Sequence, residues 1–362
     1  MTRSGVRKIV SAVLSYGVVG LVMWLLYRTV GNSGSVSDAI GSISLTHVLV
    51  VSGLGLVYLA SMFKPMTYTL PGLDLPRAGV ARTASSALAN TVPEGGTVAT
   101  GLTFAMYRSW GFTLAASTTS ILAVGLWTNL SRYGVMAIAL VVLVVFGSVS
   151  GSVVWIAVGA CVVVTAICAS IGCILSSDRF ARALGRLLTR MRGAVAERIT
   201  RIQPRDMEEQ IAIFRADLLA EVRTSWRSLT ATMVLTQVLG ATVLGVSVRM
   251  AGLGHDDIGW DRIFVAFGAM SLAAFVAPTP GGLGVAEAAL IAVLGVGLST
   301  GQQAELVAAV LVFRFATWFL PIPIGLVSYL YWRLTKNWKV FQSPRSQPSS
   351  ERHTRSEESG RA

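Results

Sequence analysis

The sequence predicts an all-α polytopic membrane protein built from two inverted-topology repeats, in which proline and glycine break helices or make them re-entrant. Hydrophobic residues make up 53% of the 362 residues and charged residues only 13%, whereas soluble domains carry about 25% charged residues. Apolar runs alternate with basic loops, and a Pro-Gly-Gly segment interrupts an apolar stretch in each half. This pattern excludes a soluble enzyme and, for most of the length, intrinsic disorder.

The elements of the first half follow from apolar runs near the ~20 residues that cross a bilayer as a helix. Such runs occur at 9–27, 47–63, 114–131 and 133–149. The intervening stretch 84–111 is only moderately apolar and contains Pro93. We therefore expect a broken or re-entrant segment there.

The second half repeats this order around a basic insertion. Apolar runs occupy 153–175 and 229–248, and the stretch 263–298 is broken by PTPGG at 278–282. A last apolar run covers 304–332 and contains Arg314. A polar, low-complexity tail from 341 to 362 is expected to be disordered and cytoplasmic.

Net charge is +12, and the excess of cations marks the cytoplasmic side of the membrane. Eleven arginines fall within 176–227, alternating with apolar residues at helical spacing. That segment is interpreted either as an amphipathic helix on an anionic leaflet or as a soluble cytoplasmic hairpin. The same rule places both termini in the cytoplasm of a multi-pass protein of the cell membrane.

The two halves match as repeats over 1–150 and 151–340. Pro93 and Pro280 are 187 residues apart, and the same shift brings Gly134 onto Pro321, where the last apolar run also breaks. The corresponding spans run in opposite directions across the bilayer. Paired interruptions in inverted repeats point to a transporter's substrate site.

The interrupted segments have the chemistry of an anion site. Proline lacks an amide donor and breaks a helix, while glycine lets backbone approach backbone or a ligand. The helix that restarts after each break presents free amide groups and a positive dipole end, which suits a lipid phosphate. The glycines concerned are Gly95, Gly96, Gly281, Gly282 and Gly284.

Ionisable residues in apolar runs are costly and usually line a pathway or pair with each other. Arg314 lies mid-span, and Glu287 lies seven residues after Pro280. They are expected either to form a structural ion pair or to take part in substrate handling, with Arg314 on a phosphate. Arg108 fits either role.

Three further polar residues have ordinary explanations beside a functional one. Arg132 and Glu305 lie near expected span ends, where long side chains reach the interface. Asn129 is expected to hydrogen-bond between helices or to line the pathway. No metal-site spacing or P-loop occurs, so the sequence predicts no cofactor. Nucleic-acid binding is not expected either, because no basic-aromatic module is present.

The segment PTPGGLGVAEAALIAVLGVG resembles the signature of the lysylphosphatidylglycerol synthase transmembrane region family, also called flippase-like domain proteins. Arg314 matches a family arginine in the next span, and Arg108 and Gly111 match the end of the first-half motif. Glu94 departs from that motif, in which glycine or an apolar residue is common. The family pattern P-x-P-G-G-x-G-x-x-E is carried by Pro278, Pro280, Gly281, Gly282, Gly284 and Glu287, and the looser first-half segment by Pro93, Gly95 and Gly96.

This resemblance implies a flippase-like lipid translocase of the cytoplasmic membrane. In the multiple peptide resistance factor, the corresponding region moves aminoacylated phosphatidylglycerol between leaflets, and a separate soluble domain performs synthesis. The polar tail leaves no room for that domain, so aminoacyltransferase activity is not expected. The expected partner is an anionic or aminoacylated phospholipid. The alternatives are a flippase or membrane partner for isoprenoid-linked sugars, and a non-transporting scaffold for envelope-synthesis enzymes.

Overall fold

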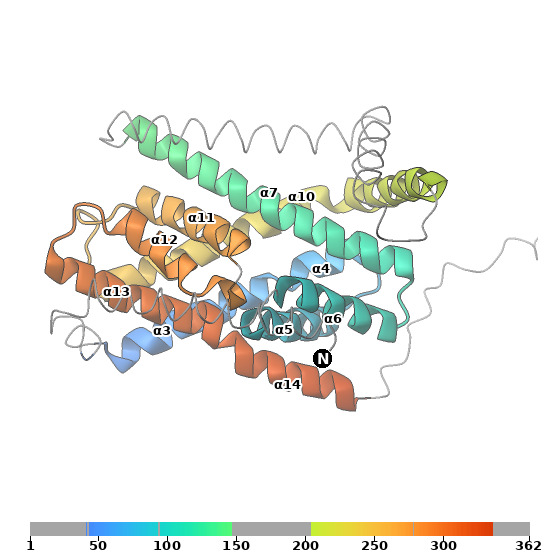
Figure 1. Cartoon of the computed structure of the whole chain (residues 1–362), viewed down its shortest axis with the longest axis horizontal. Helices are drawn as coiled ribbons and strands as arrows, with labels where there is room; N and C mark the ends of the chain where they lie inside the picture. Colours follow the sequence, from blue (N-terminus) through green and yellow to red (C-terminus); the bar gives the residue numbers. More distant parts are fainter. Residues whose placement is uncertain (1–40, 42, 93–94, 147–203, 278, 336–362) are drawn as a thin grey trace, which may run out of the picture.

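A computed structural model describes residues 41, 43–92, 95–146, 204–277 and 279–335, and all regular structure within them is helical (Figure 1). Four helices in these residues are long and apolar enough to cross a membrane. They are Leu45–Thr69, Leu114–Val142, Ser225–Met250 and Thr300–Leu334. The prediction of an all-α membrane protein with several spans is confirmed.

The elements begin and end where local sequence signals place them. The Ser44 side chain caps the first described helix, Asp74 accepts from the Arg77 amide at 2.8 Å, and Ser299 forms a capping box with Gln302. In chain order the elements are α3 (Leu45–Ser61), α4 (Lys64–Thr69), α5 (Leu75–Thr91), α6 (Gly95–Ser109), α7 (Leu114–Phe146), α10 (Pro204–Met250), α11 (Trp260–Val276), the 3₁₀ turn η2 (Pro280–Gly282), α12 (Val285–Leu294), α13 (Thr300–Arg314), the π-helical turn η3 (Phe315–Phe319) and α14 (Pro321–Leu334).

Two expected boundaries are wrong. The run 114–131 and the described part of the run 133–149 belong to one 33-residue helix, α7, because polar residues such as Arg132 do not break a helix as proline does. The stretch 204–227 was expected within a loop but forms the first part of α10, which continues into the span. The expected spans 9–27 and 153–175, the rest of the basic segment and the tail lie outside the described residues.

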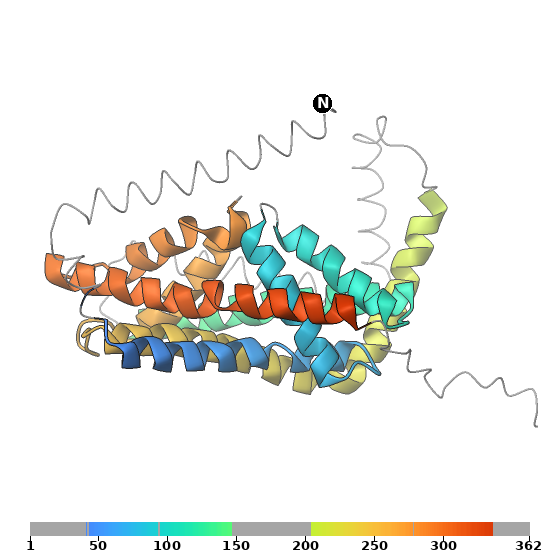
Figure 2. The ribbon, with the colours of Figure 1, turned by 90° about the horizontal axis from the view of Figure 1, so that it is seen from below.

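Two long rods cross the molecule, and two pairs of shorter helices lie between them. One rod is α7, and the other is the nearly continuous series α13–η3–α14 (Figure 1). The shorter pairs are α5 with α6 and α11 with α12, and each pair is packed together. Figure 2 shows α3 lying along α10 at one side of the bundle. The rods also contact the pairs: α14 packs on α5, and α7 packs on α11.

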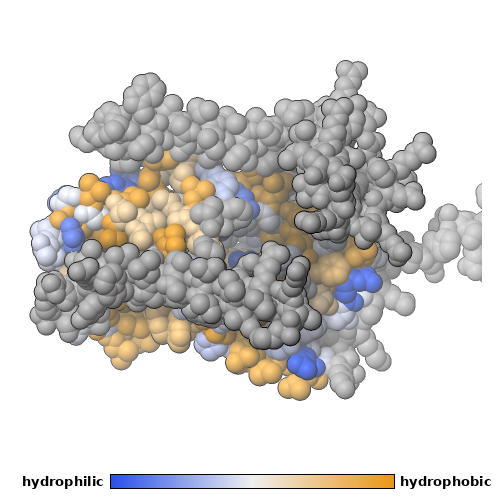
Figure 3. Space-filling view, in the orientation of Figure 1, coloured by the Kyte–Doolittle hydropathy of each residue, from blue (hydrophilic) through white to orange (hydrophobic). Residues whose placement is uncertain are grey.

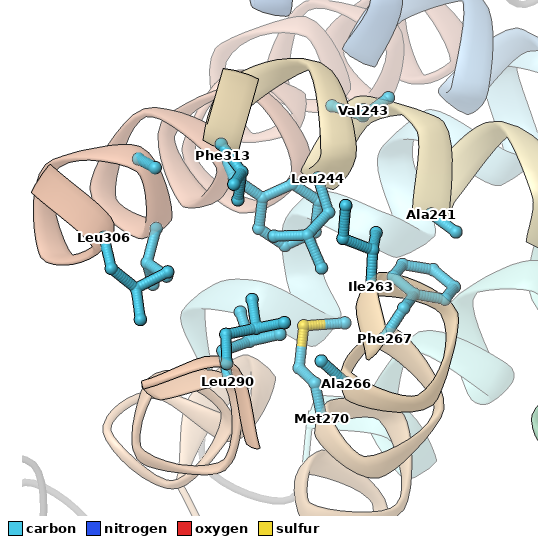
Figure 4. Close-up of a cluster of buried hydrophobic side chains, with 14 of the residues drawn as sticks. Ala241, Val243, Leu244, Ile263, Ala266, Phe267, Met270, Leu290, Leu306 and Phe313 are labelled. Atoms are coloured by element: carbon cyan, nitrogen blue, oxygen red, sulfur yellow. The ribbon is translucent and has the colours of Figure 1, made fainter. Parts of the chain in front are cut away.

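The main core fills the space between α10, α11, α12 and α13. Figure 4 shows Leu244, Phe267, Leu290 and Phe313 converging from these four helices. The rings of Phe267 and Phe313 meet edge to face with centroids 6.5 Å apart. Apolar residues also make up much of the surface that Figure 3 colours by hydropathy. Apolar side chains on both the inside and the outside are what a bilayer environment requires.

Helix α5 differs from the others because it is buried but not strongly apolar. Its packing faces carry small residues that allow close approach of α14, where Gly325 lies against the Thr83 carbonyl. Thr83 donates to Ser328 of α14 at 2.8 Å, and Ser85 bonds Thr103 of α6 at 2.6 Å. Since hydroxyl pairs satisfy each other between helices, α5 can bring polar groups to the centre of the bundle.

Candidate functional site

The second Pro-Gly-Gly segment forms a tight turn that only glycine can build. Gly281, Gly282 and Gly284 have φ values of 57°, 70° and 82°, in the left-handed region that glycine adopts without penalty. A Cβ on Gly281 would overlap the indole of Trp318. The break between α11 and α12 was predicted, and the structure confirms it.

The carboxylate of Glu287 closes this turn. Its Oε2 accepts from the amide of Gly284 at 2.6 Å, and its Oε1 accepts from Nε of Arg314 at 2.5 Å. Arg314 also donates from Nη2 to the carbonyl of Gly281 at 3.1 Å. The side chains of Arg314 and Glu287 are only 11% and 9% exposed. The ion pair considered from the sequence is therefore present and buried.

This arrangement changes the expected anion site at the start of α12. The Gly284 amide already has an anionic partner, the carboxylate of Glu287 within the same helix. Arg314 likewise has two partners from the turn, and its guanidinium lies 5.9 Å from the ring centroid of Trp318. Through these contacts the Arg314–Glu287 ion pair holds α12 and α13 together at the broken segment.

A π-helical turn connects this ion pair to the first half of the chain. The turn η3 carries Trp318, whose carbonyl accepts from Nδ2 of Asn90 on α5 at 2.9 Å. Opposite it, a Cβ on Gly55 of α3 would touch Ala316. Such π-helical turns recur at functional sites. Here the turn brings α3, α5 and the broken segment together at one place.

A polar cavity of about 140 Å³ lies at that junction. It has room for several water molecules or a small polar group. Helices α3 and α5 supply most of its wall, and η3 and α14 close it. Its lining residues are Gly55, Tyr58, Leu59, Met62, Arg82, Ser86, Asn90, Thr317 and Pro321.

Positive charge lies near the cavity. Arg82 and Tyr58 both line it, and the charges of Arg132 and Arg314 also reach Tyr58. Among the described residues, the Nε atoms of Arg82 and Arg132 are buried without a hydrogen-bond partner. Arg82 donates from Nη2 to the sulfur of Met62 at 2.9 Å, and a thioether is a weak acceptor.

Within the described residues, neither Arg82 nor Arg132 forms a salt bridge, so Glu287 balances only Arg314. The sequence interpretation placed Arg132 near the end of a span. In the structure α7 continues past position 132, so Arg132 lies inside the helix and not at its end. Arg82, which the sequence analysis did not single out, lies within α5. An arginine in the small-residue run ARTASSA was the available signal.

The structure does not gather the other predicted site residues at this cavity. Gly95 is buried where α6 begins against the end of α5, while Gly96 is exposed. Arg108 lies at the far end of the 15-residue α6, about 20 Å from Gly95 by helical rise, and donates to the carbonyl of Phe112. Asn129 bonds the carbonyl of Gly125 in its own helix at 2.9 Å. Pro93 lies outside the described residues.

No group of three or more potential metal ligands occurs among the described residues.

The family model of the lysylphosphatidylglycerol synthase TM region matches residues 8–325. The chain belongs to this family. No curated protein matches the chain by sequence comparison. Membership confirms the resemblance carried by the PTPGGLGVAE segment and indicates a membrane protein whose function concerns lipids. The matched residues therefore include both the Arg314–Glu287 ion pair and the cavity lined by Arg82.

Replacing Gly281 by alanine is expected to destabilise the protein more than replacing Gly297 by alanine. Both glycines have positive φ, 57° and 79°, which costs an alanine roughly 1–2 kcal/mol. Only at Gly281 would the new Cβ also meet an indole, since nothing lies within 4 Å at Gly297. Overpacking adds about 1–3 kcal/mol. Thermal midpoints in detergent measure the difference, and equal losses at both positions would contradict the tight turn.

Proposed function

We propose that this chain is a lipid translocase of the cytoplasmic membrane that moves an anionic or aminoacylated phospholipid between leaflets. The observation that carries the proposal is the polar cavity lined by Arg82, whose guanidinium, like that of Arg132 on α7, has a buried Nε without a hydrogen-bond partner in the described residues. Neither arginine has a carboxylate partner among the described residues. The lipid phosphate would supply the missing negative charge.

The energetic argument rests on the cost of an unpaired cation in a membrane. Two arginines inside a bundle are unfavourable unless an anion or water accompanies them. A guanidinium offers a planar set of donors that matches phosphate oxygens in a bidentate manner. Arg82 and Arg132 have buried Nε donors without protein acceptors in the described part of the chain. A headgroup whose phosphate charge is not balanced within the lipid itself therefore completes the site better than a zwitterionic headgroup.

The similar spacing of the helices in the two halves supports a transport mechanism. The starts of α5, α6 and α7 precede those of α11, α12 and α13 by 185, 190 and 186 residues, close to the shift between the two prolines. The 33-residue α7 has its counterpart in the 35-residue rod Thr300–Leu334. Each rod also packs on the short helix of the other half, α7 on α11 and α14 on α5. We infer two inverted repeats whose rocking alternates access to the cavity.

The first experiment measures leaflet exchange in proteoliposomes of phosphatidylcholine. Purified protein is reconstituted with fluorescent phosphatidylglycerol, lysyl-phosphatidylglycerol or phosphatidylcholine, and dithionite reports the outer-leaflet fraction over time. We expect exchange of the phosphatidylglycerol probe to exceed that of phosphatidylcholine by roughly tenfold or more, because the phosphate charge of phosphatidylcholine is already balanced by its own quaternary ammonium. The lysyl-phosphatidylglycerol probe reports whether an aminoacylated headgroup is accepted as well. Equal exchange of all three probes, or none above protein-free vesicles with and without a proton gradient, would overturn the proposal.

A further inference from the structure

The buried charges in the described part of the bundle do not balance. Among the residues whose burial the structure describes, Glu287 is the only buried carboxylate, and it pairs with Arg314 at 2.5 Å. Arg82 and Arg132 each keep a buried Nε donor without a hydrogen-bond partner. The charge of Arg132 also acts on Arg82, so the two guanidinium groups repel each other. An anion near Arg82 would relieve this repulsion and supply the missing acceptor.

The cavity beside Arg82 offers hydrogen-bond donors and no carboxylate. None of the described residues that line it is an aspartate or a glutamate. The hydroxyl groups of Tyr58 and Ser86 and the amide of Asn90 lie in its wall, and all three groups can donate. Asn90 uses one donor on the carbonyl of Trp318 at 2.9 Å, and a side-chain amide has a second N–H. A cation accompanied by neutral donors is the usual environment of a bound anion.

The size of the cavity restricts which anions it can enclose. Its volume of about 140 Å³ equals that of about four to five water molecules. A chloride ion with some water, or a single phosphate ion, fits within that space. A sugar acid such as gluconate carries the same charge as chloride but is too large to be enclosed. The cavity therefore selects anions by size as well as by charge.

We propose that this cavity binds a compact inorganic anion, of the size of chloride or phosphate, beside Arg82. This inference rests on the proposed function and adds its regulation, because the ion occupies the guanidinium that receives the lipid phosphate. A free phosphate and a lipid phosphate present the same oxygen atoms to an arginine. The lipid therefore has to displace the ion. Between lipids, the ion neutralises Arg82 and reduces its repulsion with Arg132.

Thermal unfolding tests the anion site without requiring transport. The full chain is purified in an uncharged detergent, and its thermal midpoint is titrated with sodium chloride or sodium phosphate. Sodium gluconate at the same ionic strength is the reference, because it screens charges equally. An ion that binds only the folded protein raises the midpoint by mass action. We expect chloride to raise the midpoint by roughly 2 °C or more above gluconate.

Two variants locate the effect, since phosphate also stabilises proteins in general by exclusion from their surface. Arg82→Met removes the charge, whereas Ser86→Leu fills the cavity and keeps Arg82. Arg333→Met and Thr100→Leu are the matched controls, because both positions are exposed on helices. We expect each of the first two variants to weaken the apparent chloride affinity roughly tenfold. The two controls are expected to keep the affinity of the native protein.

Competition is measured in phosphatidylcholine vesicles that contain fluorescent phosphatidylglycerol. Lipid exchange is followed in chloride and in gluconate at one ionic strength, so that general screening is the same in both. We expect chloride to slow exchange roughly twofold or more at concentrations near its dissociation constant, and a higher fraction of the lipid probe to restore the rate. Equal rates in the two salts would contradict the shared site.

The outcomes distinguish the anion site from the proposed function. Equal midpoints in chloride and gluconate, or a chloride effect that persists in both Arg82→Met and Ser86→Leu, would overturn the anion site. Stabilisation by phosphatidylglycerol but by no inorganic anion would mean that only the lipid binds, which also overturns it. Chloride-dependent stabilisation that is lost in both variants, in a protein that exchanges no lipid, would support the anion site and refute only the translocase.

Discussion

Replacing Arg82 by methionine is expected to reduce exchange of the anionic lipid by roughly 10–100-fold while the protein still folds and inserts. The reason is the loss of a charge-assisted contact with the phosphate, worth about 1.5–3 kcal/mol. Methionine keeps an unbranched apolar stem of similar length, and the native guanidinium has only a weak sulfur acceptor in the protein, Met62. Removing the guanidinium of Arg82 therefore leaves no buried charged group without its partner among the described residues.

The same proteoliposome assay measures this effect, with size-exclusion profiles and thermal midpoints as checks on folding. Arg333→Met is the matched control, because Arg333 is exposed at the end of α14 and its described side-chain contact is the hydroxyl of Tyr329 at 3.4 Å. Arg82→Lys is expected to fall between the two, because lysine keeps the charge but not the planar donors. Unchanged exchange in a folded Arg82→Met protein would remove Arg82 from the site.

Neutralising Arg314 and Glu287 together is expected to restore much of what either single substitution loses. Arg314→Met leaves a buried carboxylate without its partner, and breaking a buried pair from one side costs about 3–5 kcal/mol. The double variant Arg314→Met/Glu287→Gln contains no uncompensated charge, and the glutamine can still accept from the Gly284 amide. We expect its thermal midpoint to lie well above that of Arg314→Met.

Transport by the double variant separates the two roles considered for Arg314. If the Arg314–Glu287 pair has only a structural role, exchange of the anionic lipid recovers together with stability, because Arg82 and Arg132 remain. We expect this result, since Arg314 is 11% exposed and already bonded to Glu287 and Gly281. A stable double variant without transport would instead assign the phosphate contact to Arg314.

Much of the fold could be predicted because the relevant signals are local. Apolar runs of bilayer length, prolines and glycines act within a few residues of where they stand. The break at 278–284 and the apolar helices around it are examples, and the PTPGGLGVAE segment was sufficient to suggest the family. The boundary expected at position 132 failed because arginine has a high helix propensity and no proline stands near it to stop α7.

The sequence alone determined that this protein is helical and membrane-embedded, and that its second half contains a glycine turn near Glu287 and Arg314. Only the tertiary structure decided that those two residues pair, and that Arg82 and Arg132 come from separate helices to the neighbourhood of Tyr58. The physical reason is that charge compensation depends on distances in space. Side chains on α5, α7 and α13 belong to no common sequence window, so no local pattern shows which cations share a cavity.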